Sequence, residues 1–170
     1  LTGGAGNDTL DAGAGDDQLI GGDGDDLLIG GAGSDLLDGG NGIDTVSYAG
    51  SSLWVNVDLA NNNQWNGDAS WDNVTNVENV TGSAYADNIS GNSGANLLKG
   101  GAGVDTLYGL GGNDIIHGDD DGDIIIGGSG RDELWGGAGA DVFKVLSLSD
   151  SQTGNADTIV VQGETNERHQ

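Results

Sequence analysis

Aspartate recurs at every ninth residue over two long stretches of the chain. The first stretch begins at Gly3 and reads GGAGNDTLD, AGAGDDQLI, GGDGDDLLI, GGAGSDLLD and GGNGIDTVS, and the sixth residue of each copy is Asp. Evenly spaced carboxylates offer oxygen ligands, and carboxylate and carbonyl oxygens are the donors that hard divalent cations prefer. Cation binding is therefore the first chemistry that this pattern indicates.

The same period returns at Gly82 and continues to Lys144. Its copies read GSAYADNIS, GNSGANLLK, GGAGVDTLY, GLGGNDIIH, GDDDGDIII, GGSGRDELW and GGAGADVFK, so twelve nonapeptides account for 108 of the 170 residues. A repeat of this extent determines the fold. The candidate metal ligands at position six are Asp8, Asp17, Asp26, Asp35, Asp44, Asp87, Asp105, Asp114, Asp123, Asp132 and Asp141, and one copy has Asn96 there.

Glycine dominates positions one, two and four of the repeat. Because glycine adopts positive φ without a Cβ clash, it permits a tight turn whose carbonyl oxygens point inward. The glycines that we expect to supply such oxygens are Gly4, Gly6, Gly22, Gly24, Gly31, Gly33, Gly101, Gly103, Gly128 and Gly130. Position eight, from Leu10 to Phe143, is always aliphatic or aromatic. This pattern predicts a three-residue strand whose middle side chain points inward and whose positions seven and nine face outward.

Two copies are expected to complete one coil, so that strands 18 residues apart stack in parallel at ~4.8 Å. The carboxylates of alternate repeats then form two files, one with Asp8, Asp26 and Asp44 and one with Asp17 and Asp35. At an effective dielectric of about 20, two such neighbours repel by roughly 3 kcal/mol. The coil therefore requires a bridging divalent cation. Ca²⁺ suits an all-oxygen site better than Mg²⁺, which requires a smaller octahedron and keeps its waters.

The tandem phrases resemble the RTX nonapeptide GGxGxDxUx. The resemblance implies an all-β fold, a right-handed parallel β-roll or β-solenoid that binds calcium. Pairs of alternate repeats give three sites in each block, and Asp87–Asp105 and Asn96–Asp114 add two, so we expect about six to eight Ca²⁺ ions. Six would reduce the formal charge of −24 to −12, and eight would reduce it to −8.

Several copies depart from the motif. Ser83, Tyr85 and Ala12 replace glycines, and Asn96 removes a charge, while Asp121 and Gly122 alter one turn. We therefore expect weaker sites, or none, at the start of the second block.

The period divides the chain into four parts of one continuous solenoid. We predict a first RTX block at residues 1–47, an irregular β insert at 48–81, a second block at 82–144, and a C-terminal cap with a frayed polar tail at 145–170. In the insert, Leu53, Val55, Val57 and Leu59 alternate with polar residues, which predicts a strand buried on one face. NNNQWNGDAS is predicted to be a loop. Val74, Val77 and Val80 fit either a helical turn or irregular coils of the solenoid, and we favour the coils.

The insert also contains Trp54, Trp65 and Trp71, which either cover the flank of the roll or stack on sugars; we favour the first. Asp58, Asp68 and Asp72 are either solvated or form another cation site, and here too we favour the first. Outward positions hold a set of large apolar residues that either meet a partner or are covered by the insert or a neighbouring domain, the interpretation that we favour. This set consists of Leu27, Ile29, Tyr108, Ile124, Ile126 and Trp135.

Composition and motifs limit the possible functions. With 28 acidic and four basic residues, the chain repels nucleic acid and anionic membranes. It has no cysteine and no apolar run of membrane-spanning length. The two histidines, His117 and His169, form no HExxH motif, and no GxSxG or phosphate-binding motif occurs. We therefore expect no catalytic site in this chain.

The resemblance implies a module of a secreted bacterial protein, extracellular or on the cell surface. We expect it to stay extended in calcium-poor cytosol, to leave through a type I secretion apparatus, and to fold on extracellular calcium. The absence of an initiator Met leads us to expect a piece of a larger protein whose activity lies elsewhere. The alternative is a carbohydrate- or surface-binding module that uses Tyr108, Trp135 or the tryptophans of the insert.

Overall fold

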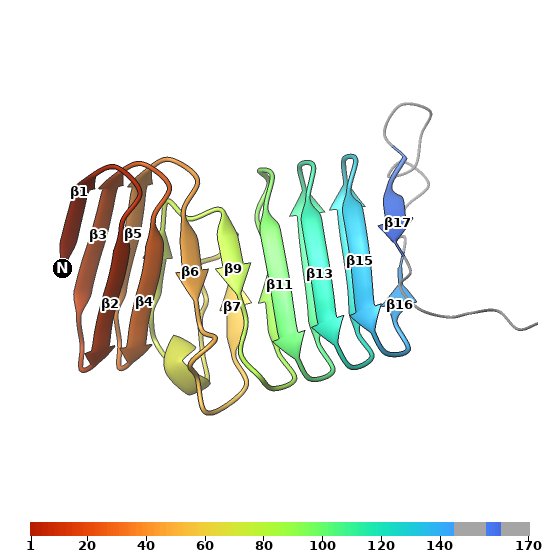
Figure 1. The fold of residues 1–170 in the computed structure, drawn as a ribbon, viewed down its shortest axis with the longest axis horizontal. Coiled ribbons are helices and arrows are strands. Elements are labelled where there is room, and N and C mark those ends of the chain that lie inside the picture. The colour runs from red at the N-terminus through yellow and green to blue at the C-terminus, as the bar shows by residue number, and fades with distance from the viewer. Residues whose placement is uncertain (145–155, 161–170) are drawn as a thin grey trace, which may run out of the picture.

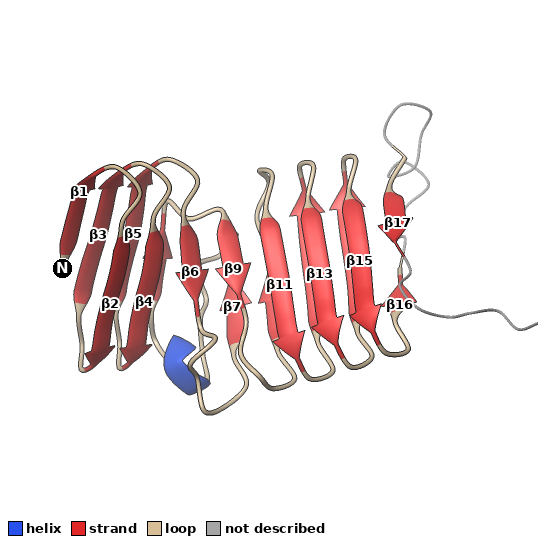
Figure 2. Ribbon diagram, in the orientation of Figure 1, coloured by secondary structure: helices blue, strands red, loops and turns tan. Residues whose placement is uncertain are grey.

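Parallel strands stacked in a flattened coil make up the chain (Figure 1). The computed structural model describes residues 1–144 and 156–160. Within these ranges the fold is an all-β parallel β-solenoid, as predicted from the repeat. The described residues contain one short helical segment, the 3-10 turn η1 (Gly67–Ala69), and no helix long and apolar enough to span a membrane (Figure 2).

One face of the solenoid is a continuous sheet of eight strands. It consists, in spatial order, of β2 (Thr9–Ala14), β4 (Leu27–Ala32), β6 (Thr45–Ser47), β9 (Asn79–Thr81), β11 (Leu97–Ala102), β13 (Ile115–Asp120), β15 (Glu133–Ala138) and β17 (Thr158–Val160). All neighbours in this sheet pair in parallel. The sheet therefore crosses the non-repetitive insert without a break.

The opposite face is divided into two sheets. The first contains β1 (Thr2–Ala5), β3 (Gln18–Asp23), β5 (Leu36–Asn41) and β8 (Asn73–Thr75). The second contains β7 (Asn56–Asp58), β10 (Asn88–Ser90), β12 (Thr106–Gly111), β14 (Ile124–Ser129) and β16 (Val142–Phe143). β7 precedes β8 in the chain, yet β7 joins the second sheet and β8 joins the first. We call this reversal, between β8 and β7, the seam.

Strands of successive coils pair with an offset of 18 residues wherever the repeat is regular. Leu10 pairs with Leu28, for example, and Leu107 pairs with Ile125. The predicted parallel stacking is therefore confirmed. The predicted strand length of three residues is right for β6 and β10, but it is wrong for β2–β5 and β11–β15, which have six residues each. Strand pairing continues to the next position-two glycine, as in the pair Gly13–Gly31, because no side chain separates the coils there.

The core is one row of position-eight side chains between the two faces. Those from Leu10 to Leu134 are buried, and Phe143 is half-buried at the end of the row. Val74 and Val80 continue this row through the insert, since Val74 pairs with Leu37 and Val80 pairs with Val46. The favoured interpretation of these valines as irregular coils is confirmed.

The insert differs in part from its predicted structure. β7 contains only Asn56–Asp58; Val57 is buried in it and Val55 just before it, but Leu53 is 53% exposed and lies outside the strand. The predicted strand from Leu53 is therefore wrong. Asp58 and Asn61 close a tight turn directly after β7, since the backbone N–H of Asn61 donates to Oδ1 of Asp58.

The tryptophans of the insert do not all cover the roll. Trp54 and Trp65 pack edge to face with ring centroids 4.9 Å apart, whereas Trp71 is 80% exposed. On the outer surface, η1 lies against β4, which carries the half-buried Leu27 and Ile29. Residues 145–155 and 161–170, and with them most of the predicted cap, its tail and His169, lie outside the described residues.

Candidate metal sites

The residue just before each strand occupies position six of the repeat, and these residues form two files. The long file precedes the strands of the continuous sheet. It consists of Asp8, Asp26, Asp44, Glu78, Asn96, Asp114, Asp132 and Asp157. The structure thus brings the predicted residues of this file together and adds Glu78 from the insert and Asp157 before the C-terminal strand.

The split file precedes the strands of the divided face. Its first part consists of Asp17, Asp35 and Asp72, and its second part consists of Val55, Asp87, Asp105, Asp123 and Asp141. The two parts meet at the seam. All predicted aspartates therefore lie in one of the two files.

From the second coil onward, a carboxylate oxygen of the files accepts from the backbone of the preceding coil and so joins the two coils. The backbone N–H of Asp8 donates to Oδ1 of Asp26 (2.7 Å), and the N–H of Asp26 donates to Oδ1 of Asp44 (2.8 Å). Asp105 donates in the same way to Asp123 (2.8 Å) in the second block. These bonds fix the carboxylates in stacked positions, so the charges cannot move apart into solvent.

The second oxygen of the same carboxylates has no hydrogen-bond partner, although it is buried. This holds for Oδ2 of Asp8, Asp26, Asp35, Asp44, Asp105, Asp114 and Asp123. A buried, unpaired carboxylate oxygen is unfavourable by several kcal/mol unless a cation compensates it. The file therefore has a regular set of ligand atoms that the protein itself leaves unsatisfied.

A backbone carbonyl lies beside all of these oxygens except Oδ2 of Asp35. A Cβ placed on Gly21 would overlap both Oδ2 of Asp26 and the carbonyl oxygen of Gly39, one coil further on. The two oxygens therefore converge on a space that only a glycine leaves open. The same convergence occurs at the turns that lead to Asp8, Asp26, Asp44, Asp105, Asp114 and Asp123.

The converging carbonyls belong to position-one glycines of the next coil, in all these turns but that of Asp44, where the carbonyl of Asn76 takes their place. The glycines predicted from the sequence stand at positions two and four. All of them have positive φ, as expected, but the carbonyl of Gly4 faces Gly22, the equivalent glycine in the next coil. The carbonyls of positions two and four stay the predicted ligands, and those of position one are further candidates that sequence reasoning missed.

The donor set fits calcium. Carboxylate and carbonyl oxygens suit Ca²⁺, which accepts six to eight oxygen ligands in flexible geometry. Among the described residues, no three His, Cys, Asp or Glu side chains gather at one point. Each site would therefore combine the carboxylates of a file with backbone oxygens of the turns, and the ion would neutralise stacked negative charge.

Comparison with known families agrees with this geometry. The RTX calcium-binding nonapeptide repeat matches the chain in four copies, at residues 1–28, 14–46, 81–116 and 117–144. The chain belongs to the RTX calcium-binding repeat family. Its repeats bind Ca²⁺, and the fold is the β-roll that the resemblance implied. A comparison of the RTX chain with curated proteins gave no match.

Three members of the files were missed in the sequence because no glycine turn precedes them. Asp72, Glu78 and Asp157 occupy position six before β8, β9 and β17. Asp72 accepts from the N–H of Asp35 and Glu78 accepts from the N–H of Asp44. A signal was present, since the phrases DNVT, ENVT and DNIS repeat an acid, Asn, a β-branched residue and a hydroxyl.

Burial raises the pKa values of the file carboxylates in the metal-free arrangement. Desolvation is the main cause and neighbouring carboxylates add to it, while backbone N–H donors oppose it. The pKa rises from 3.8 to about 8 for Asp105, to about 7 for Asp114 and to about 6 for Asp123. The pKa values of Asp35 and Asp44 are raised in the same direction.

Acidification should therefore favour the metal-free fold of the RTX chain over its unfolded state. Because the folded, metal-free pKa of Asp105 is about 8 and its unfolded value is 3.8, the metal-free fold holds the extra proton between these values. That fold loses stability as pH rises through this window and gains stability on acidification. Circular dichroism of the chain in chelator at pH 8 and at pH 5 measures this effect, and we expect more β-sheet signal at pH 5. Less sheet at pH 5 than at pH 8 would contradict it.

Replacing one buried carboxylate should remove calcium without removing the ladder bond. In Asp26→Asn, Oδ1 still accepts from Asp8, but an amide nitrogen replaces the unpaired Oδ2. We expect the loss of at least one bound ion and a shift of the calcium midpoint for folding to higher concentration. Asp11→Asn, which removes the same charge from an exposed position-nine residue, is the matched control and should leave the ion count unchanged. Equal effects of the two variants would refute a specific role of the file.

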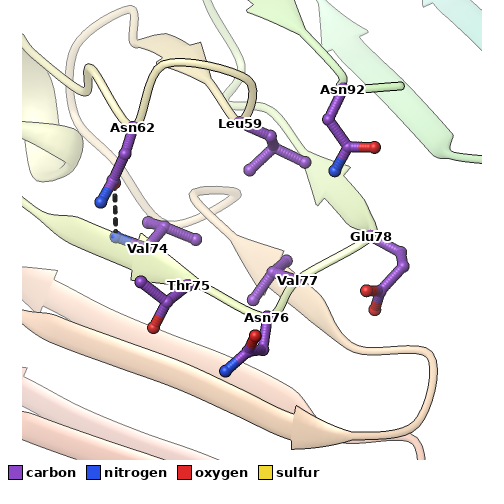
Figure 3. A pocket seen from close by; sticks show the side chains of 8 residues that line it. All are labelled: Leu59, Asn62, Val74, Thr75, Asn76, Val77, Glu78 and Asn92. Carbon is purple, nitrogen blue, oxygen red and sulfur yellow. Dashed lines mark hydrogen bonds between the residues drawn. The ribbon is translucent and has the colours of Figure 1, made fainter. Parts of the chain in front are cut away.

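The remaining candidates do not form a comparable site. A groove of about 420 Å³ opens at the seam, lined by Leu59, Asn62, Val74, Thr75, Asn76, Val77, Glu78 and Asn92 (Figure 3). Its polar groups are largely engaged within the protein. Asn62 accepts from the N–H of Val74, and Asn76 donates to Asp38. The suggested ion site of Asp58, Asp68 and Asp72 does not assemble among the described residues.

Proposed function

We propose that the chain is a calcium-triggered folding module of a larger secreted protein. The buried, unpaired oxygens of the two files are the observation that carries this proposal, because the folded coil contains them whether or not a cation is present. A ligand that binds only the folded state stabilises it by mass action. Calcium concentration therefore determines whether the chain is folded.

The ligands in this proposal are the position-six aspartates of the regular repeats, together with turn carbonyls. They would hold about six to eight Ca²⁺ ions, three in each block and up to two at the start of the second. Without calcium, a net charge of −24 keeps the chain extended and soluble. An extended chain suits export through a type I secretion apparatus, and folding outside the cell then gives a rigid scaffold.

Small-angle scattering across a calcium titration tests this proposal. The radius of gyration of 170 residues should fall from roughly 44 Å to below about 20 Å on folding. We expect the midpoint at about 10⁻⁴–10⁻³ M calcium, the range of extracellular calcium modules. Compaction that is complete below about 10⁻⁶ M calcium would contradict folding outside the cell.

A second candidate function is binding of a carbohydrate or cell surface, which the outer face of the continuous sheet favours. His117 and Trp135 pair in adjacent strands and stack with ring centroids 5.7 Å apart and planes 11° apart. Lys99 lies in register on the other side of His117. Flat aromatic rings beside cationic and polar groups can stack on sugar rings. A glycan array with calcium present, comparing the RTX chain with its Trp135→Ala variant, tests this: binding by neither protein excludes it.

A further inference from the structure

Two turns near the seam have a different backbone from all the regular turns. Position two has positive φ throughout the regular repeats, even where Leu110 (φ 76°) or Asp119 (φ 77°) replaces glycine. Among the described residues, the exceptions are Ser83 and Asn92. The strands β9 and β10, which lead into these turns, have only three residues.

The different backbone turns the position-two N–H toward position six of the same repeat. The N–H of Ser83 donates to Oδ2 of Asp87 (2.5 Å), and the Ser83 hydroxyl donates to Oδ1 (2.8 Å). The N–H of Asn92 likewise donates to Oδ1 of Asn96 (2.9 Å), while Nδ2 of Asn96 donates to the carbonyl of Glu78 (2.6 Å). The atoms that stay unsatisfied in the regular turns are thus satisfied here by the protein.

At Asp72, next to the seam, a protein donor also satisfies the second carboxylate oxygen, but here the donor is a side chain. The hydroxyl of Tyr48 donates to Oδ2 of Asp72 (3.0 Å), and both side chains are buried. Asp72, Asp87 and Asn96 all lie in coils next to the seam, and none of them has a buried side-chain oxygen without a partner. Unsatisfied oxygens begin again with Asp105 and Asp114, one coil further on.

The narrow space itself is retained in these turns. A Cβ on Gly82 would meet Oδ2 of Asp87 and the carbonyl oxygen of Gly100, the arrangement found in the regular turns. Only the position of the N–H differs. The difference therefore lies in which group compensates the buried oxygen.

We propose that the turns Gly82–Asp87 and Gly91–Asn96 bind no calcium, because protein hydrogen-bond donors compensate the oxygens that calcium compensates elsewhere. The seam then separates two calcium arrays, one in each block. This inference rests on the proposed function, since it assumes that the regular turns bind calcium.

Restoring the motif in each turn tests the inference. Ser83→Gly with Tyr85→Gly changes the turn to GGAGAD, and Asn92→Gly with Asn96→Asp changes the other to GGSGAD. Each double variant should bind one more calcium ion than the unmodified chain, as counted by native mass spectrometry and by calorimetry. Ser93→Ala, an exposed position-three change in the same turn, is the control and should leave the count unchanged.

A second variant keeps the test decisive if a double variant fails to fold. Asn96→Asp alone restores the carboxylate but retains the Asn92 N–H as its donor, so it should leave the ion count unchanged, and a gained ion would contradict the inference. If the folded double variants keep the original ion count, the inference is wrong. If the unmodified chain binds no calcium at all, the proposed function fails instead, so the two failures are distinguishable.

Discussion

Removal of calcium with a chelator is expected to abolish the parallel sheets of the folded chain. Among the described residues, seven buried carboxylate oxygens then lack any partner. At about 1–3 kcal/mol for each, their combined cost is comparable with the whole stability of a typical domain, about 5–15 kcal/mol. The hydrophobic core cannot offset this cost, because each nonapeptide contributes only one fully inward side chain.

Circular dichroism during chelation and re-addition of calcium measures this effect. The β-sheet signal should disappear with chelator and return with calcium. Magnesium at the same concentration is the control and should restore little, because it requires a smaller octahedral site and dehydrates reluctantly. A chain that keeps its sheets in chelator would contradict the argument from buried oxygens.

The second large effect is a loss of stability on substitution of one glycine by alanine. A Cβ on Gly31 would overlap the carbonyl oxygen of Gly13 in the preceding coil, and the backbone there has φ of +89°. Gly31→Ala therefore adds a backbone clash to left-handed strain, and we expect it to lower the free energy of unfolding by more than about 4 kcal/mol. Because the clashing atom is backbone, the neighbour cannot rotate away.

Gly13→Ala is the matched control. Gly13 has the same place in the repeat and φ of +96°, but no atom lies within 4 Å of its added Cβ, because β2 is the edge strand of its sheet. Only the left-handed strain remains, about 1–2 kcal/mol. Urea unfolding at saturating calcium compares the two variants. Equal losses of stability would show that coil stacking does not require glycine.

The features that repeat every nine residues could be predicted from the sequence. Position six must be acidic and position eight apolar wherever a turn and a strand alternate, so the regular files and the core row were found from spacing alone. The long strands were missed because glycine disfavours strands in general. In this fold, however, the absence of a Cβ allows successive coils to approach and pair, as at Gly13 and Gly31.

The insert was harder to predict because tertiary contacts determine it. Asp72 and Glu78 are six residues apart, yet Asp72 belongs to the split file and Glu78 belongs to the long file. Their places follow from pairing of β8 with β5 and of β9 with β6, which no local pattern encodes. Val55, an apolar residue at position six, donates its N–H to Asp87 and begins the second part of the split file.

Because the order of β7 and β8 is reversed, strand pairing ties the two halves of the molecule together. The strand that comes first in the chain, β7, pairs with β10 in the second half, whereas β8 pairs with β5 in the first half. If the loop between β7 and β8 were cleaved, the N-terminal fragment would still contribute β7 to the second sheet. The C-terminal fragment would still contribute β8 to the first sheet. Neither half can therefore unwind as far as the middle of the molecule without first extracting a strand from its neighbour.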